Sequence, residues 1–503
     1  MLNKYLKSIL KAQVYAVAKE TPLDPMKFLS KRLNNQVLLK REDLQPVHSF
    51  KLRGAYNHMA NLDEASLKAG LIAASAGNHA QGVAYVANKL GASAVIVMPK
   101  TTPDTKVMAV RGYGAEVILH GDTFDEAYEM AVQLGEEKGY TFVHPYDDPL
   151  VIAGQGTIGM EILRQHAGPI EAIFVPVGGG GLIAGIGAYV KYLRPEIKII
   201  GVEAEDSACL TAALEHNERV ILDEVGLFAD GVAVKQIGEI TFELAKICVD
   251  EMVTVSCDEI CASIKDIFDD TRSIAEPAGA LAIAGMKKYV QKYNLKDSTL
   301  VAINSGANTN FDRLRHISER TELGENREAI LAVTIPEKPG SFLTFCRALG
   351  QYSISEFNYR FAEKGDARVF VGVKISAGAG RDELVKGLKY SGYSVLDMSD
   401  NEMAKLHLRH MVGGRVLTQP RERIFRFEFP ERPGALLSFL VKLGQRGNIS
   451  LFHYRNHGAA YGRVLVGFQF SEGDESLDEF MQGVGYRYIE ESDNPAFKLF
   501  LSS

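Results

Sequence analysis

Between about residues 36 and 320, short apolar runs alternate with segments of helical periodicity, and this alternation constrains the fold more than any other feature of the chain. The runs show no regular alternation of polar and apolar residues, as expected for strands that are buried on both faces. The pattern predicts an α/β fold in which helices cover both faces of open parallel sheets. The predicted strands are 37–40, 71–74, 94–98, 172–177, 197–202 and 299–303.

Lys51 stands between Phe50 and Leu52 in a segment that is able to form a helix. A lysine held among apolar side chains loses hydration of its charged form, so its pKa falls and the neutral amine becomes a nucleophile. Lys51 is therefore a candidate Schiff-base lysine. The local sequence also allows a second interpretation, in which Lys51 extends along an apolar face and keeps its ammonium group in water.

Four consecutive glycines, Gly178 to Gly181, follow a predicted strand and precede Leu182 at a predicted helix start. A backbone without side chains can approach a phosphate closely, and the free amides of a helix N-terminus favour its negative charge. Residues 179–184 also satisfy the G-x-G-x-x-A pattern of dinucleotide-binding folds, and Glu203 is placed to bind a ribose. A nicotinamide cofactor is therefore an alternative, although it assigns no role to Lys51.

Two further polar segments follow predicted strands, Ser75-Ala76-Gly77-Asn78-His79 and Ser305-Gly306-Ala307-Asn308. The first can open a helix whose amides suit a carboxylate, and the Asn78 amide can donate to a phenolic oxygen. In the alternative interpretation, Ser75 or Asn78 only caps that helix and His79 is a structural histidine. The carboxyl ends of parallel strands meet at one edge of a sheet, so we expect the four motifs to share one site.

With these four motifs in this order, the chain resembles the fold type II family of pyridoxal phosphate enzymes and, within it, the biosynthetic threonine deaminases. The likeness extends over nearly the whole chain. It implies that Lys51 is the catalytic residue and that Ser75, Ala76, Gly77, Asn78 and His79 contact the substrate. The implied contacts of pyridoxal 5'-phosphate are Lys51, Phe50, Asn78, Gly178, Gly179, Gly180, Gly181, Leu182 and Ser305.

The resemblance also implies a reaction, the deamination of L-threonine to 2-oxobutanoate and ammonia in the first committed step of isoleucine biosynthesis, with serine as a secondary substrate. Ser305 is the implied partner of the pyridine nitrogen. A hydroxyl does not hold that nitrogen protonated as a carboxylate would, so the ring is a weaker electron sink, which favours β-elimination over transamination. Inhibition by isoleucine, activation by valine and a homotetramer are further expectations from the family.

Two other functions are alternatives to this one. Another fold type II enzyme, such as a serine racemase or a catabolic serine/threonine dehydratase, is not expected to carry a tandem repeat in its C-terminal third. A catalytically silent amino-acid sensor would use that repeat alone, and the intact Lys51 argues against it.

The C-terminal third contains an internal repeat. Ile335-Pro336-Glu337-Lys338-Pro339-Gly340 recurs 94 residues later as Phe429-Pro430-Glu431-Arg432-Pro433-Gly434, and Phe357-Asn358-Tyr359-Arg360 recurs 95 residues later as Phe452-His453-Tyr454-Arg455. Each copy predicts a ferredoxin-like βαββαβ unit. The copies resemble the ACT-like regulatory domains of the threonine deaminases, and duplication for oligomerisation alone is the structural alternative.

The repeat divides the chain into a catalytic domain at 1–320, a linker at 321–328 and two ACT-like repeats at 329–400 and 423–497. Tyr359 and Tyr454 occupy equivalent positions, which we expect close to the start of the second strand of each repeat. The family resemblance assigns the effector contacts to these two tyrosines. Packing between the repeats is the alternative role.

Composition narrows the class of protein further. A length of 503 residues suggests about three domains. The net charge of −7 argues against nucleic acid as a partner. Five scattered cysteines do not form a disulfide framework, and Cys257 and Cys261 lack the further ligands of a metal site. Residues 1–19 have the pattern of an amphipathic helix that packs on the core rather than of a membrane span, so we expect a cytoplasmic protein.

Overall fold

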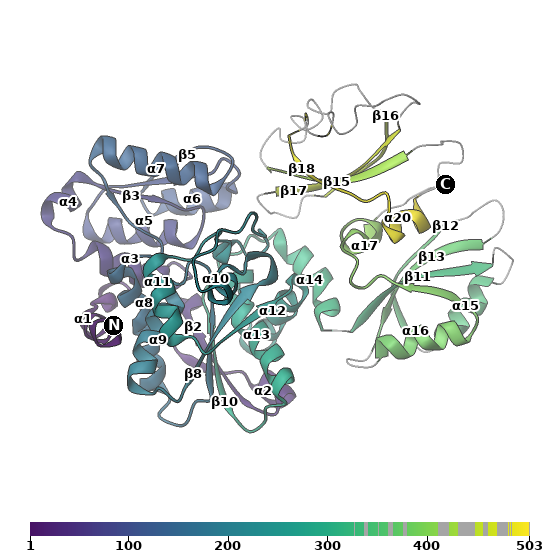
Figure 1. Cartoon of the computed structure of the whole chain (residues 1–503), viewed down its shortest axis with the longest axis horizontal. Helices are drawn as coiled ribbons and strands as arrows, with labels where there is room; N and C mark the ends of the chain where they lie inside the picture. Colours follow the sequence, from purple (N-terminus) through teal and green to yellow (C-terminus); the bar gives the residue numbers. More distant parts are fainter. Residues whose placement is uncertain are drawn as a thin grey trace. The chain divides into compact units, whose positions relative to one another are not determined.

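The computed structural model divides into two compact units, Met1–Ser318 and Glu319–Ser503. Figure 1 shows the helices and strands of both units. The structure describes all residues except 326, 337–340, 351, 361–365, 376–379, 411–421, 431–447, 456–460, 470–480, 482, 484 and 502–503.

The first unit is built on two sheets. The larger sheet has six strands in the order β1-β2-β10-β7-β8-β9. Neighbouring strands in it are parallel, except that β1 is antiparallel to β2. The smaller is fully parallel, in the order β5-β4-β3-β6. The strands are β1 (Leu23–Pro25), β2 (Gln36–Arg41), β3 (Leu71–Ala74), β4 (Ala94–Met98), β5 (Glu116–Leu119), β6 (Thr141–Phe142), β7 (Ala172–Pro176), β8 (Lys198–Ala204), β9 (Glu251–Val255) and β10 (Thr299–Asn304).

Helices connect these strands and cover both sheets (Figure 1). They are α1 (Leu2–Lys11), α2 (Lys27–Leu33), α3 (Lys51–Met59), α4 (Glu64–Ala69), α5 (Asn78–Leu90), α6 (Asp104–Gly112), α7 (Phe124–Lys138), α8 (Pro149–Gln165), α9 (Gly181–Leu193), α10 (Cys209–His216), α11 (Glu239–Cys248), α12 (Cys257–Thr271), α13 (Pro277–Tyr293) and α14 (Arg313–Gly324). Among the described residues, no helix has the length and apolar character needed to cross a bilayer.

Successive residues of each central strand enter different cores, which explains the unbroken apolar runs. In β3, Leu71 and Ala73 belong to the core on the α5 side, whereas Ile72 and Ala74 belong to the core on the α7 side. Side chains alternate between the faces of a strand, so a strand covered on both faces needs apolar residues throughout. The predicted parallel α/β architecture is confirmed, and all six predicted strands are present.

The amphipathic N-terminal segment forms a shorter helix than its pattern suggested. Helix α1 ends at Lys11, and a single 3-10 turn follows at Val14–Ala16. Tyr5, Ile9 and Val14 are buried against the first unit. Part of the apolar face of this segment therefore packs on the core, as predicted, whereas Leu10 is exposed.

The second unit contains two four-stranded antiparallel sheets, ordered β12-β13-β11-β14 and β16-β17-β15-β18. Both follow the 2-3-1-4 order of a ferredoxin-like unit, which confirms the predicted duplication. The elements are β11 (Glu328–Pro336), α15 (Ser341–Leu349), β12 (Ser353–Arg360), β13 (Asp366–Lys374), α16 (Gly380–Tyr390), β14 (Ser394–Asp397), α17 (Glu402–Leu406), β15 (Glu422–Pro430), β16 (Asn448–Arg455), β17 (Tyr461–Gln469), β18 (Arg487–Glu490) and α20 (Pro495–Phe500).

The expected position of the two tyrosines within their strands was wrong. Tyr359 and Tyr454 are the next-to-last residues of β12 and β16, not near their starts. The strands begin earlier because the residues before each tyrosine already pair with the neighbouring strand. The two positions share one register, since Tyr359 faces Val369 and Tyr454 faces Val464. The side chains of both tyrosines lie outside the described part.

Helix α3, which begins with Lys51, is held between α5 and α8 by close backbone contacts. A Cβ atom on Gly154 of α8 would lie 2.6 Å from the carbonyl oxygen of Arg53, and one on Gly82 of α5 would lie 3.2 Å from the amide nitrogen of Leu52. Glycine is required at such approaches because any side chain would push the helices apart.

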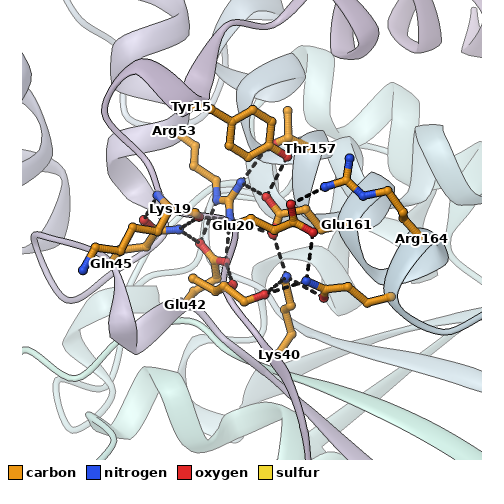
Figure 2. A network of polar contacts seen from close by, with 12 residues as sticks. Tyr15, Lys19, Glu20, Lys40, Glu42, Gln45, Arg53, Thr157, Glu161 and Arg164 are labelled. Carbon is orange, nitrogen blue, oxygen red and sulfur yellow. Dashed lines mark hydrogen bonds and ion pairs between the residues drawn. The ribbon is translucent and has the colours of Figure 1, made fainter.

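A buried ion network also fixes α3 (Figure 2). Arg53 forms ion pairs with Glu42 at 2.8 Å and with Glu161 of α8 at 2.5 Å, and Lys40 of β2 contacts Glu161 at 2.6 Å. All four side chains are fully buried. Tyr15 donates a hydrogen bond to Glu161 at 2.8 Å, which ties the N-terminal segment to the network. The two cations and two anions balance, so the buried cluster is neutral.

We predict that Arg53→Met lowers the free energy of unfolding of the first unit by about 3 to 5 kcal/mol, because Glu42 and Glu161 lose their shared cation while buried. The matched control is Arg164→Met, which removes the exposed pair of Arg164 with Glu20 and should cost no more than about 1 kcal/mol. Scanning calorimetry of the full chain checks both values. Equal losses in the two variants would contradict the assignment.

Candidate cofactor and active site

The beginning and the end of the first unit meet at the candidate site. Ser49 and Gly306 form an antiparallel bridge, the Phe50 amide donates to the Ser305 carbonyl at 3.2 Å, and the Ala307 amide donates to the His48 carbonyl at 2.9 Å. In the chain, Ser305 directly follows β10, and Ser49 follows β2 after the 3-10 turn Glu42–Leu44. This backbone pairing places the first residue of α3, Lys51, beside the Ser305 segment.

Lys51 lies in an environment that lowers its pKa. Its Nζ donates to the Pro145 carbonyl at 3.0 Å and lies 5.3 Å from the centre of the Phe50 ring. Burial lowers the pKa of Lys51 to about 8, although the Glu276 carboxyl acts in the opposite direction. About a tenth of the Lys51 amine is therefore neutral and nucleophilic at pH 7, far more than for an ordinary lysine.

The glycine run packs closely against Tyr146 and Val232. A Cβ atom on Gly179 would lie 2.3 Å from the Tyr146 ring, and one on Gly181 would lie 3.0 Å from the Tyr146 carbonyl oxygen. A Cβ atom on Gly178 would lie 2.9 Å from the Val232 Cα. Gly180 has a φ of +88° directly before α9, a conformation that favours glycine. The run therefore leaves backbone amides free at the N-terminus of a 13-residue helix, which suits a phosphate.

Tyr146 and the segment around Val232 connect the glycine run to the other motifs. Pro145, which accepts from Lys51, directly precedes Tyr146 in the chain. A Cβ on Gly231 would lie 3.8 Å from the Asn78 Nδ2. The structure thus brings all four predicted motifs together through these two segments, which the sequence did not single out.

Asn78 opens α5 after β3, and both ends of its side-chain amide are engaged. Asn308 Nδ2 donates to Asn78 Oδ1 at 2.7 Å, and Asn78 Nδ2 donates to Glu276 Oε1 at 2.5 Å. In the turn before α5, the Gly77 amide donates to Ser75 Oγ at 3.2 Å. Neither Asn308 nor Glu276 was among the predicted site residues.

His79 is buried in α5, and its Nε2 lies 2.8 Å from the Val143 carbonyl oxygen. Burial, together with the Lys51 charge, lowers the pKa of His79 to about 3, so the ring is neutral at neutral pH. A carbonyl oxygen only accepts, so Nε2 carries the ring proton. This geometry favours the structural role over proton transfer.

The residues present fit pyridoxal phosphate. Lys51 supplies an amine of lowered pKa, the glycine run supplies a phosphate site, and Ser305 supplies a buried hydroxyl, which here donates to the Ala278 carbonyl at 3.3 Å. Two buried polar side chains that flank these groups, Ser49 and Asn304, have side-chain atoms without a hydrogen-bond partner. Fold and site together define an α/β enzyme of the pyridoxal phosphate class.

Comparison with known proteins agrees with this class. Residues 15–306 match the family described as pyridoxal-phosphate dependent enzyme, and residues 319–408 and 413–501 each match the C-terminal regulatory domain of threonine dehydratase. The chain is 56% identical to L-threonine dehydratase biosynthetic IlvA of Burkholderia multivorans, over 99% of both chains. It is also 56% identical to the protein of the same name from Escherichia coli, over 99% of this chain and 97% of that one.

A solved structure, the processed form of threonine deaminase isoform 2 from Solanum lycopersicum, matches with a TM-score of 0.63 and 51% identity, over 64% of this chain and 88% of that one. The chain belongs to the biosynthetic threonine dehydratase family and uses pyridoxal phosphate. Serine racemase from Dictyostelium discoideum matches 61% of this chain at 31% identity, so the racemase alternative leaves the C-terminal repeats without a counterpart.

We predict that the rate at which the cofactor-free protein takes up pyridoxal phosphate rises with pH with a midpoint near pH 8, because only the neutral Lys51 amine attacks the aldehyde. Stopped-flow absorbance of the bound cofactor measures this rate. A midpoint near the ordinary lysine value of about 10.4 would contradict the lowered pKa.

Proposed function

We propose that this protein is a threonine ammonia-lyase, which converts L-threonine to 2-oxobutanoate and ammonia and accepts serine as a secondary substrate. The observation that carries the proposal is the convergence of Lys51, Asn78, Ser305 and the glycine run in a chain that matches L-threonine dehydratases over its full length.

We assign cofactor contacts to Lys51, Phe50, Asn78, residues 178–182 and Ser305, and substrate contacts to residues 75–79. Pyridoxal phosphate, when bound, supplies an electron sink for the pair left when the α-proton departs. Lys51 Nζ then takes the proton from the α-carbon of threonine, and its lowered pKa suits a general base near neutral pH. The substrate carboxylate is held at the N-terminus of α5, where amides are free.

The overall reaction removes the α-proton and the β-hydroxyl as water. The released enamine tautomerises, and water returns as the imine hydrolyses to 2-oxobutanoate and ammonia. His79 takes no part in this proton transfer, because its neutral ring is tied to the Val143 carbonyl.

We predict that Lys51→Ala lowers threonine turnover by at least about 10⁴-fold, because nucleophile and base are one residue. The production of 2-oxobutanoate measures the effect. Lys68→Ala, which changes an exposed lysine on α4, is the matched control and should retain full turnover. Normal turnover by the Lys51 variant would disprove the assignment.

For the second unit we propose regulation by branched-chain amino acids, namely inhibition by isoleucine and activation by valine. Support comes from the two matches to the regulatory domain of threonine dehydratase. We assign effector contacts to Tyr359 and Tyr454, whose backbone positions are equivalent in the two repeats. An inhibitor acts only if it binds the less active state better. We further propose that the protein is a cytoplasmic homotetramer. We also propose that each chain consists of a catalytic domain at 1–320, a linker at 321–328 and repeats at 329–400 and 423–497.

We predict that Tyr359→Ala or Tyr454→Ala raises the isoleucine concentration for half inhibition by at least about fivefold, which corresponds to a coupling of about 1 kcal/mol. Activity without isoleucine should be unchanged. Tyr390→Ala is the matched control, because Tyr390 lies on α16 of the first repeat with its side chain 95% exposed.

A chain that ends at residue 324, the last residue of α14, should deaminate threonine without any response to isoleucine. Equal inhibition of full-length, truncated and tyrosine-substituted proteins would show that the repeats are not the sensor.

A further inference from the structure

Glu276 is a buried carboxyl group that the helix beside it does not use. It occupies the N-cap position of α13, yet its side chain makes no capping hydrogen bond, and Pro277 follows at the first helical position. The residue is 3% exposed. Within the described part of the chain, no ion pair is formed by its carboxyl. Burying a carboxyl without a cation is costly, so a role outside the helix is expected.

The hydrogen bond that Glu276 accepts comes from the site. Asn78 Nδ2 lies 2.5 Å from Glu276 Oε1, and this contact joins the start of α13 to the start of α5. On the other side, Asn308 Nδ2 donates both to Asn78 Oδ1 at 2.7 Å and to the Val47 carbonyl at 2.8 Å. Because a carbonyl accepts only, these bonds fix which end of the Asn78 amide is the donor. The second hydrogen of Asn78 Nδ2 stays available for a ligand.

Two glycines make room for the carboxyl. A Cβ on Gly306 would lie 2.5 Å from Glu276 Oε1, and one on Gly231 would lie 3.6 Å from the same oxygen. The Glu276 carboxyl therefore contacts Asn78 and lies close to Gly306, the residue that directly follows Ser305.

We propose that Glu276 is a positioning residue of the reaction, which holds the Asn78 amide so that its free hydrogen points to the cofactor. The expected effect of Glu276 on turnover rests on the proposed function. Its expected effect on cofactor binding does not, because binding is measured independently of turnover.

The charge of Glu276 also changes near neutral pH. Burial and the neighbouring Asp230 raise the pKa of Glu276 to about 7, whereas its hydrogen bond from Asn78 and the charges of Lys106 on α6 and Arg313 on α14 act in the opposite direction. Lys51 on α3 faces the same carboxyl, which raises the lysine pKa. Below about pH 7 the carboxyl is protonated and this support of the Lys51 charge is lost.

Three full-length variants separate geometry from charge. Glu276→Gln keeps an oxygen that can accept from Asn78 but does not titrate. Glu276→Asp keeps the charge but withdraws the carboxyl by one methylene group. Glu259→Gln removes a carboxyl that caps the adjacent helix α12 and is the matched control. The dissociation constant of pyridoxal phosphate and the absorbance of the bound cofactor from pH 5 to 9 are measured for each, together with kcat and KM for threonine.

We expect Glu276→Asp to raise the cofactor dissociation constant by about tenfold or more, and Glu276→Gln to keep it within about threefold of wild type. The absorbance of the wild type should show a titration near pH 7 that is absent from the Gln variant, and Glu259→Gln should match wild type in both measurements. Wild-type affinity of the Asp variant, or a tenfold loss in the Gln variant, would overturn the proposal.

If Glu276→Asp did not fold, Asn308→Ala would decide the question, since it removes the other anchor of Asn78. A loss of about tenfold in cofactor affinity would support the proposal, and unchanged affinity would overturn it. A wild-type protein that binds the cofactor but does not deaminate threonine would disprove the proposed function, while the binding measurements still decide the role of Glu276.

Discussion

The parallel pairing of β2 with β10 is the constraint on which the arrangement of the first unit depends. Thr299 pairs with Gln36 and Asn304 with Arg41, so segments 263 residues apart in sequence lie side by side. The segments carrying Lys51 and Ser305 follow these two strands, and the bridge between Ser49 and Gly306 extends the contact beyond the sheet. The site therefore exists only when the ends of the unit have met. Such distant pairing costs little extra closure entropy but is slow to form.

Two groups of buried charges in this unit differ in their partners. In the network around Arg53, every charged side chain has an oppositely charged partner at short distance, and these ion pairs hold α3 in place. In the site, neither Lys51 nor Glu276 forms an ion pair with another described residue, so burial lowers the pKa of Lys51 and raises that of Glu276. The paired charges give rigidity, and the unpaired charges give groups that can exchange protons at neutral pH.

The sequence predicted the parallel architecture and the four motifs because both leave local signals. Strands buried on both faces are apolar throughout, and glycines are needed where Gly179 and Gly180 lie against Tyr146 and Thr241. Glu276 left no such signal, because an acid before a proline is an ordinary helix start. Asn308 belongs to the motif that begins at Ser305, yet its hydrogen bond to Asn78 joins segments 230 residues apart in sequence. Contacts of this kind follow from tertiary structure and not from local pattern.

The second unit shows that duplication preserved geometry as well as sequence. Tyr359 is paired with Val369 and Tyr454 with Val464, in the same strand register. Most residues between the two members of each pair nevertheless differ between the repeats. The repeats are not independent, however, because one hydrophobic core is shared between them. Its members include Ile330 and Phe370 of the first repeat and Ile424 and Leu465 of the second, with α17 and α20 packed against both. Interiors are close-packed, so a displacement of core residues in one repeat has to be accommodated by the residues of the other repeat that pack in the same core.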